Sequence, residues 1–250
     1  MGKRIDLMGV PVDALTMEET VARVAEIIEE GTPRQHMAVN AGKVVKMLKD
    51  VELREVVLNS DLLNADGAAI VYASRILGTP LPERVTGIDL MEHVVRMAAE
   101  KGYKPYFLGA KRAIVERVVE IYRERYPSLE IAGFRDGYFT AEEEQRVAET
   151  VRDSGAHILF VAMSSPKKET FLGRHMQTMN VPFCMGVGGS FDVVAGKVQR
   201  APAWMRENGL EWAYRLKQEP RRMLRRNAIE SPKFVALVLR ARLGRFRMPR

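Results

Sequence analysis

The sequence is poor in cysteine and lacks any long uninterrupted run of apolar residues. Its single cysteine, Cys184, excludes an internal disulfide and suits a reducing compartment. Cys184 lies in an apolar stretch, residues 181–186, so we interpret it as a small buried side chain and not as a nucleophile. No apolar stretch is long enough to cross a bilayer. We also expect no secretory signal peptide, because the first four residues lead directly into a short strand-like run at residues 5–10.

Signatures of several enzyme classes are also missing. No histidine has the spacing of a metal ligand, and the absence of an Asp-x-Asp motif argues against a divalent metal that bridges a nucleotide-sugar diphosphate. There is no P-loop, no G-x-G-x-x-G fingerprint and no serine nucleophile elbow. We therefore expect neither a metal nor a cofactor. If the protein is an enzyme that acts on a diphosphate without a metal, it has to neutralise the charge of the leaving group with arginines, lysines and helix N-termini.

Negative charge is scarce in the C-terminal part of the chain. From Trp212 to the end there are twelve arginines and lysines but only two glutamates, a net charge of +10. Because the whole chain carries +7, the remaining residues sum to −3. An excess of positive charge that is confined to one segment indicates an anionic partner that binds at this segment.

Three partners fit this basic tail: a diphosphate, an anionic membrane or a nucleic acid. Nucleic acid is the weakest, because the tail lacks interleaved stacking aromatics and any helix-turn-helix or RNA-binding signature. Apolar residues beside the arginines strengthen the interpretation as a contact with an anionic membrane surface. They are Phe234, Val235, Leu237, Val238 and Leu239. The alternative for this apolar face is a contact with the core or within a homo-oligomer, and membrane contact and packing do not exclude each other.

The order of elements predicts the α/β fold class. From about residue 37 to residue 187, short apolar runs alternate with segments of helical periodicity, which predicts a parallel sheet with right-handed crossovers. We expect a Rossmann-like parallel sheet flanked by helices, followed by a basic C-terminal helical appendage. The alternation stops near residues 199–204, so we place the core at residues 1–200 and the appendage at residues 201–250.

Some boundaries follow from local signals. Thr16 and Glu19 predict a capping box that opens a helix ending at residue 31, and Thr140 predicts the cap of a helix over residues 139–154. In the tail we expect a helix from residue 202 through residue 216, an interruption at Pro220, a short second helix, and a last helix that Pro232 opens.

One stretch, residues 59–69, organises our interpretation of the site. It holds a short apolar run, then Asp66, and then small residues that open an amphipathic segment. A carboxylate between a strand and a helix lies at the edge where α/β sheets bind ligands, which makes Asp66 a candidate general base. An aspartate before a helix is also a common N-cap, and the residues alone do not decide between the two roles.

Three further strand-to-helix junctions carry candidate residues. Asn40 follows a brief strand. Gly188 and Gly189 follow another strand, in a motif that Asp192 closes, and we favour close approach of a ligand there over a tight turn alone. Residues 164–169 form the third junction. Its two lysines, including Lys168, are suited to an anion, although a solvated exposed pair is the more common outcome.

Together these stretches resemble the WecG/TagA/CpsF family of bacterial glycosyltransferases, of the N-acetylmannosaminyltransferase type. The resemblance extends in order from about residue 5 to residue 226. It is carried by Asn40, Ala65-Asp66-Gly67, Leu81-Pro82-Glu83-Arg84-Val85-Thr86-Gly87, Asp136-Gly137-Tyr138-Phe139, Ser165-Pro166-Lys167, Gly186-Val187-Gly188-Gly189-Ser190-Phe191-Asp192, Arg200-Ala201-Pro202, Gly209-Leu210-Glu211-Trp212 and Gln218-Glu219-Pro220-Arg221-Arg222.

The resemblance implies an inverting, metal-independent transferase that uses no cofactor. Such an enzyme moves a sugar, N-acetylmannosamine in the best-known members, from a UDP-sugar onto an undecaprenyl-diphosphate-linked N-acetylglucosamine at the cytoplasmic membrane face. The product serves cell-wall or surface polysaccharide synthesis. The family's catalytic aspartate falls on Asp66 and its loop arginine on Arg84. The arginines thought to close over the diphosphate and to meet the membrane fall on Arg215, Arg222 and Arg225.

The resulting hypothesis is a single displacement. Asp66 takes the proton of the acceptor hydroxyl, Arg84 and the glycine-rich loop stabilise the departing diphosphate, and Asn40 and Lys168 orient the sugar or the acceptor.

Two departures from the family pattern concern specificity. Ala38 stands where many relatives have threonine, and Lys168 stands where the usual motif has glutamine. A cation there favours a more acidic donor or acceptor, and the alternative to N-acetylmannosamine is another sugar such as a hexose or a uronic acid. A non-catalytic nucleotide- or membrane-binding protein is the alternative from another class. A dinucleotide-dependent oxidoreductase would share the sheet but lacks its glycine fingerprint.

Overall fold

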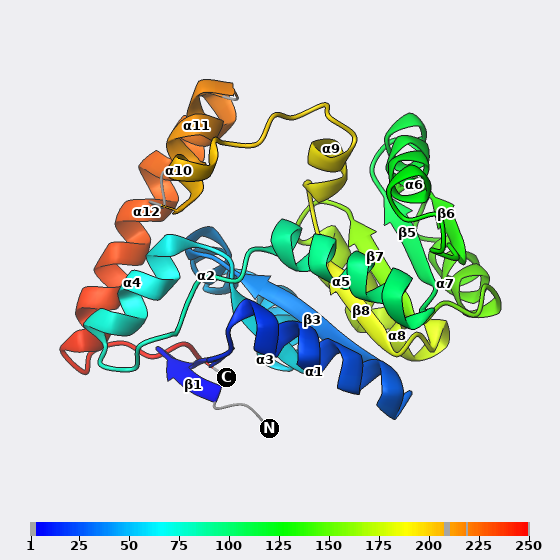
Figure 1. Cartoon of the computed structure of the whole chain (residues 1–250). Helices are drawn as coiled ribbons and strands as arrows, with labels where there is room; N and C mark the ends of the chain where they lie inside the picture. Colours follow the sequence, from blue (N-terminus) through cyan, green and yellow to red (C-terminus); the bar gives the residue numbers. More distant parts are fainter. Residues whose placement is uncertain (1–3, 208–210, 219, 250) are drawn as a thin grey trace.

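The computed structural model describes residues 4–207, 211–218 and 220–249, without the side chains of residues 207, 212, 215 and 221–228. Within these ranges a parallel sheet has the strand order β4-β3-β8-β7-β5-β6, and β1 and β2 form a separate antiparallel hairpin (Figure 1). The strands are β1 (Arg4–Leu7), β2 (Val10–Asp13), β3 (Arg34–Val39), β4 (Leu62–Ala65), β5 (Pro105–Gly109), β6 (Gly133–Arg135), β7 (Ile158–Ala162) and β8 (Phe183–Gly186).

Helices cover both faces of the sheet, as the α/β prediction requires. They are α1 (Met17–Glu30), α2 (Ala41–Met47), α3 (Val51–Leu58), α4 (Ala68–Ile76), α5 (Gly87–Lys101), α6 (Arg112–Arg125), α7 (Glu144–Asp153), α8 (Lys167–Met179), α9 (Ser190–Val194), α10 (Ala203–Glu207), α11 (Glu211–Gln218) and α12 (Pro220–Arg242). The predicted capping box at Thr16 and Glu19 is confirmed, and α1 ends at Gly31 with φ 70°.

Alternate residues of β5, β7 and β8 sort into two apolar clusters. In β5, Tyr106 and Leu108 belong to one cluster and Phe107 to the other. The first cluster includes side chains of α2, α3, α4, α7, α8 and α12, and the second includes those of α1, α5, α6 and α9. The sheet is therefore the middle of three layers, and the predicted fold class is confirmed.

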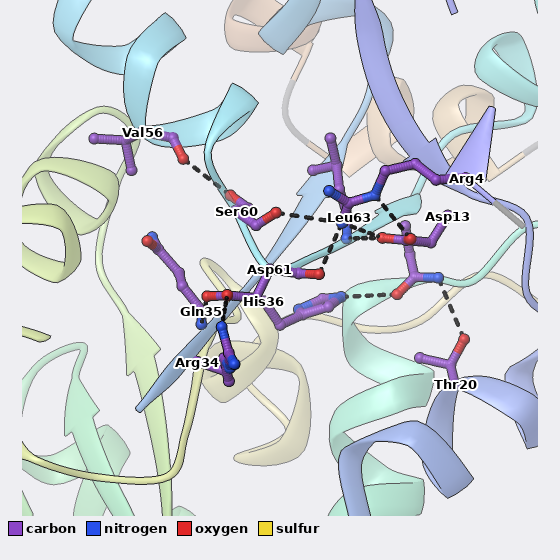
Figure 2. Close-up of polar contacts among 11 residues, drawn as sticks. Arg4, Asp13, Thr20, Arg34, Gln35, His36, Val56, Ser60, Asp61 and Leu63 are labelled. Carbon is purple, nitrogen blue, oxygen red and sulfur yellow. Dashed lines mark hydrogen bonds and ion pairs between the residues drawn. The ribbon is translucent and has the colours of Figure 1, made fainter. Parts of the chain in front are cut away.

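Buried polar contacts fix the hairpin and the two strands beside it (Figure 2). Asp13 accepts hydrogen bonds from the Arg4 guanidinium at 2.8 and 2.9 Å and from the backbone N–H of Leu63 at 2.7 Å. Nε2 of His36 lies 3.1 Å from Oδ1 of Asn64. Burial lowers the pKa of His36 to about 4, so the ring is neutral at pH 7 and donates to the Asn64 oxygen.

Two predicted boundaries are wrong. The helix expected from residue 139 begins only at Glu144, because a turn holds the preceding residues. In that turn the backbone N–H of Thr140 donates to the Glu143 carboxylate at 2.8 Å, so only half of a capping box forms. The single strand-like run at residues 5–10 is instead the first strand and the turn of the β1–β2 hairpin.

The tail also differs from its prediction. Pro220 begins α12 as expected, but Pro232 lies inside this helix and does not open a new one. The helix continues through the proline, and residues on both sides of it contact the core: Glu230 lies against Gly42 of α2, and Phe234 is buried in the first cluster. No helix among the described residues is long and apolar enough to cross a membrane.

The chain after α12 returns to the N-terminal hairpin. The backbone N–H of Met248 donates to the carbonyl oxygen of Met8 at 2.6 Å, and Arg247 forms an ion pair with Asp6. The side chain of Met248 is buried in the first cluster. Residues 230–238 of α12 and the segment beyond its C-terminal end thus both contact the core.

Candidate active site

Four of the predicted junctions meet along one edge of the sheet. Asn40 follows β3, Asp66 follows β4, the glycine-rich loop follows β8 and residues 164–169 follow β7, and these four strands are neighbours in the order β4-β3-β8-β7. The loop that carries Arg84 joins them, because the backbone N–H of Val85 donates to the carbonyl of Ala65 at 3.0 Å. Parallel α/β sheets bind ligands outside the carboxyl ends of their strands, so this edge is the candidate active site.

Asp66 does not cap the helix that follows it. Helix α4 has Gly67 as its N-cap and no side-chain cap hydrogen bond. The half-buried Asp66 carboxylate instead accepts a hydrogen bond, 3.2 Å long, from the backbone N–H of Gly87, the first residue of α5. The interpretation of Asp66 as the cap of its own helix is therefore wrong. A carboxylate held against a second helix N-terminus is oriented at the edge of the sheet, which suits a base as well as an anchor.

Asn40 combines a structural contact with a position at the site. Its Oδ1 accepts the backbone N–H of Lys43 at 3.0 Å and so caps α2. The side chain also lies against Gly67, next to Asp66. The cap uses the amide oxygen, which leaves the amide N–H groups as the donors that Asn40 offers to a ligand.

A buried cluster of three charges lies at the same edge. Lys43 Nζ is 3.0 Å and Lys168 Nζ 2.9 Å from Oε1 of Glu169, which is fully buried. Burial lowers the pKa of Lys43, and the charge of Lys168 acts in the same direction. Burial raises the pKa of Glu169, but the two lysines outweigh it and hold that pKa below its ordinary value. The expectation that Lys168 belongs to an exposed, solvated pair is wrong.

The path of Lys168 explains one glycine of the loop. A Cβ atom added to Gly186 would stand 3.1 Å from Cδ and Cε of Lys168, so the glycine makes room for the lysine stem. The neighbouring Lys167 turns away and donates to the carbonyls of Gly137 and Phe139, both at 3.3 Å. The two adjacent lysines thus have different environments.

The glycine-rich loop has the backbone that its sequence suggested. Gly188 has φ +55°, a conformation that residues with a side chain rarely adopt, and no heavy atom lies within 4 Å of a Cβ added to Gly189. Open space beside the backbone is compatible with the approach of a ligand. Asp192, predicted to bind substrate, forms an ion pair with Lys197 at 2.9 Å at the outer side of α9.

Arg84 links the site to the segment that precedes α11. Its guanidinium donates to the carbonyl oxygen of Arg206 at 3.2 Å and lies 3.5 Å from the Glu211 carboxylate. Close by, Asp89 of α5 pairs with Arg200 at 2.6 Å. Burial raises the pKa of Asp89, but Arg200, Thr86 and Arg206 together bring it below its ordinary value. The loop before α5 and residues 200–211 are therefore joined by charged contacts.

Some residues of this site escaped the sequence analysis, and some predictions cannot be compared with the structure. No role was assigned to Glu169 and Glu211, which stand within stretches that were singled out, to Lys43, which shares the junction of Asn40, or to Asp89, which lies outside these stretches. The predicted arginines of the tail lie in α11 and α12, but their side chains are outside the described residues. They are Arg215, Arg222 and Arg225.

A cavity of about 440 Å³ lies elsewhere, between the β1–β2 hairpin, the end of α3 and the segment around Met248. It has no part in the strand-end site. Among the described residues, no group of three histidine, cysteine, aspartate or glutamate side chains is arranged to hold a metal ion.

Comparison with known proteins identifies the class. The model of the glycosyl transferase WecG/TagA/CpsF family matches residues 5–248, so the chain belongs to this family. The resemblance that the motifs suggested is confirmed, and it places the strand-end site in a family of glycosyltransferases.

Two relatives carry the same name, N-acetylglucosaminyldiphosphoundecaprenol N-acetyl-beta-D-mannosaminyltransferase. The one from Bacillus spizizenii (strain ATCC 23059 / NRRL B-14472 / W23) is 35% identical over 187 residues, which cover 74% of this chain and 71% of the relative. The one from Bacillus subtilis (strain 168) is 33% identical over 193 residues, which cover 77% of this chain and 74% of the relative.

Proposed function

We propose that this protein transfers N-acetylmannosamine from a UDP-sugar to an undecaprenyl-diphosphate-linked N-acetylglucosamine. The names of the two relatives support the donor sugar and the acceptor. The observation that carries the proposal is the position of Asp66, at the end of β4 and bonded to the N-terminus of α5, beside the Arg84 loop.

The proposed reaction is a single displacement with inversion and without a metal. Asp66 takes the proton from the acceptor hydroxyl. At the same time the oxygen of that hydroxyl attacks the anomeric carbon from the face opposite UDP. The backbone N–H groups at Gly188 and Gly189, together with Arg84 and the tail arginines, stabilise the departing diphosphate. Asn40 orients the sugar through its amide N–H groups. When the diphosphate is bound, the Arg84 guanidinium either breaks its ion pair with Glu211 or contacts the Glu211 carboxylate and the diphosphate together.

A donor screen tests this function. Release of UDP is measured with UDP-N-acetylmannosamine, UDP-N-acetylglucosamine and UDP-glucuronic acid, each with a synthetic lipid diphosphate that carries N-acetylglucosamine. We expect the fastest release with UDP-N-acetylmannosamine, and no loss of rate with EDTA. Fastest release with UDP-glucuronic acid would support the acidic donor that Lys168 suggests. No release above that of an acceptor-free control with any donor contradicts the transferase proposal.

We also propose that the outer side of α12 contacts an anionic membrane. Val235, Leu239 and Leu243 recur at four-residue spacing and are each more than half exposed. Helix α4 lies beside α12 (Figure 1). It carries the exposed side chains of Tyr72 and Ile76. Arginines lie among these residues in the sequence, and an exposed apolar stripe beside basic residues fits the surface of an anionic bilayer.

Vesicle flotation tests the membrane proposal. The variant Val235→Asp/Leu239→Asp is expected to bind vesicles of phosphatidylglycerol and phosphatidylcholine at least ~10-fold more weakly, because each apolar side chain contributes about 1.5–3 kcal/mol when buried. Val51→Asp, an exposed valine on α3, is the matched control. If both variants float as the wild type does, α12 is not the contact. The alternative is that the protein self-associates through the same face of α12. Analytical ultracentrifugation in the absence of lipid detects such self-association.

A further inference from the structure

The cluster of Lys43, Lys168 and Glu169 has more positive charge than a structural ion pair needs. Both ammonium groups lie within 3.0 Å of the same carboxylate oxygen, and the lysine side chains are only 8% and 10% exposed. One carboxylate neutralises one ammonium group. Among the described residues, the second buried cation has no carboxylate of its own within ion-pair distance, which is costly unless an anion compensates it.

The surroundings of the cluster indicate where that anion binds. Burial and the charge of Lys168 lower the pKa of Lys43, whereas Glu169 and, to the smallest extent, the charge of Asp66 raise it, so Asp66 lies near enough to act on this cluster. At the other lysine, a Cβ atom added to Gly188 would stand 4.0 Å from Nζ of Lys168. The cluster therefore connects Asp66 with the glycine-rich loop, the two features between which a reacting ligand is expected.

We propose that Lys43 and Lys168, held together by Glu169, form a subsite for the diphosphate of a nucleoside diphosphate sugar. Each ammonium group has three N–H donors and uses one on Glu169, which leaves donors for phosphate oxygens. The inference rests on the proposed function. It assigns diphosphate binding to Lys43 and the positioning of both lysines to Glu169. It also changes the expected role of Lys168 from orienting the sugar or the acceptor to binding the diphosphate.

The subsite also responds to the chemical step. With Asp66 ionised, the four side chains sum to zero charge. When Asp66 takes the acceptor proton, the sum becomes +1, while the bond between the anomeric carbon and the diphosphate oxygen breaks and that oxygen gains negative charge. Proton uptake by the base thus strengthens the interaction with the leaving group in the same step, which stabilises the transition state more than the bound donor.

Binding measurements on single variants test the subsite. Lys43→Met and Lys168→Met each leave Glu169 with one lysine, so we expect both to fold, and thermal melts verify it. Each variant is expected to bind UDP about 10–100-fold more weakly, because a charge-assisted hydrogen bond is lost, and to bind uridine as the wild type does. Lys46→Met, an exposed lysine on the same helix α2, removes the same charge and is expected to bind UDP normally.

Two outcomes separate the subsite from the proposed function. UDP affinity within twofold of wild type in both folded variants overturns the subsite, whatever the enzyme transfers. If the wild-type protein binds no UDP, the proposed donor class fails, and inorganic diphosphate becomes the probe. Diphosphate binding that depends on Lys43 and Lys168 but not on Lys46 then supports the subsite, and equal binding by all variants refutes it.

Discussion

Replacement of Asp66 by asparagine is expected to lower turnover by about 10²–10⁴-fold and to leave the free energy of unfolding nearly unchanged. Asparagine keeps an oxygen that can accept the Gly87 N–H, so the contact between the end of β4 and α5 survives. What the variant loses is the ability to take a proton from the acceptor hydroxyl. Single-turnover measurement of sugar transfer, with thermal unfolding as a parallel assay, gives both quantities.

Asp66→Ala provides the comparison that separates the base from the anchor. Alanine loses the hydrogen-bond acceptor as well as the proton acceptor. If Asp66 only anchors the Gly87 N–H, asparagine retains activity and alanine loses it, and the assignment of the base fails. If Asp66 is the base, the two variants are similarly inactive and differ mainly in stability.

Glu169→Gln is expected to destabilise the fold by roughly 3–5 kcal/mol, because it removes the carboxylate that both buried ammonium groups share. For a domain of this size that loss lowers the melting temperature by roughly 6–20 °C. Denaturant unfolding followed by circular dichroism measures it. The large effect arises from the removal of the shared partner and not from the strength of either ion pair.

Two further variants make this prediction specific. Glu52→Gln removes the carboxylate of an exposed pair with Arg174, where about 0–1 kcal/mol is expected. Lys43→Met added to Glu169→Gln removes one of the two stranded charges and is expected to restore part of the stability. Equal losses for Glu169→Gln and Glu52→Gln, or no recovery in the double variant, contradict the shared-partner account.

Local signals predicted much of the fold and several positions of the site. The alternation of apolar runs and helical periods led to the parallel sheet, and a strand followed by small or polar residues located Asn40, Asp66 and Gly188. These features depend on residues close together in the chain. Because strands of a parallel sheet end at a common edge, junctions found one at a time meet in space.

The rest depends on contacts between distant parts of the chain. Helical periodicity does not reveal that Lys43 points inward to a carboxylate on α8, because lysine is normally exposed and its partner is far along the sequence. The ion pair of Arg84 with Glu211 is likewise a property of the folded arrangement. Pro232 was misjudged because its local tendency to end a helix is outweighed by packing on either side.

The contact between Met8 and Met248 has a consequence for biosynthesis. These residues lie far apart in the sequence, so their hydrogen bond forms only after the ribosome has passed Met248. Until then, the apolar side chains of α2 and α4 that α12 covers remain open to solvent. A nascent chain can therefore assemble the sheet early, but it closes this apolar face only after α12 has been synthesised.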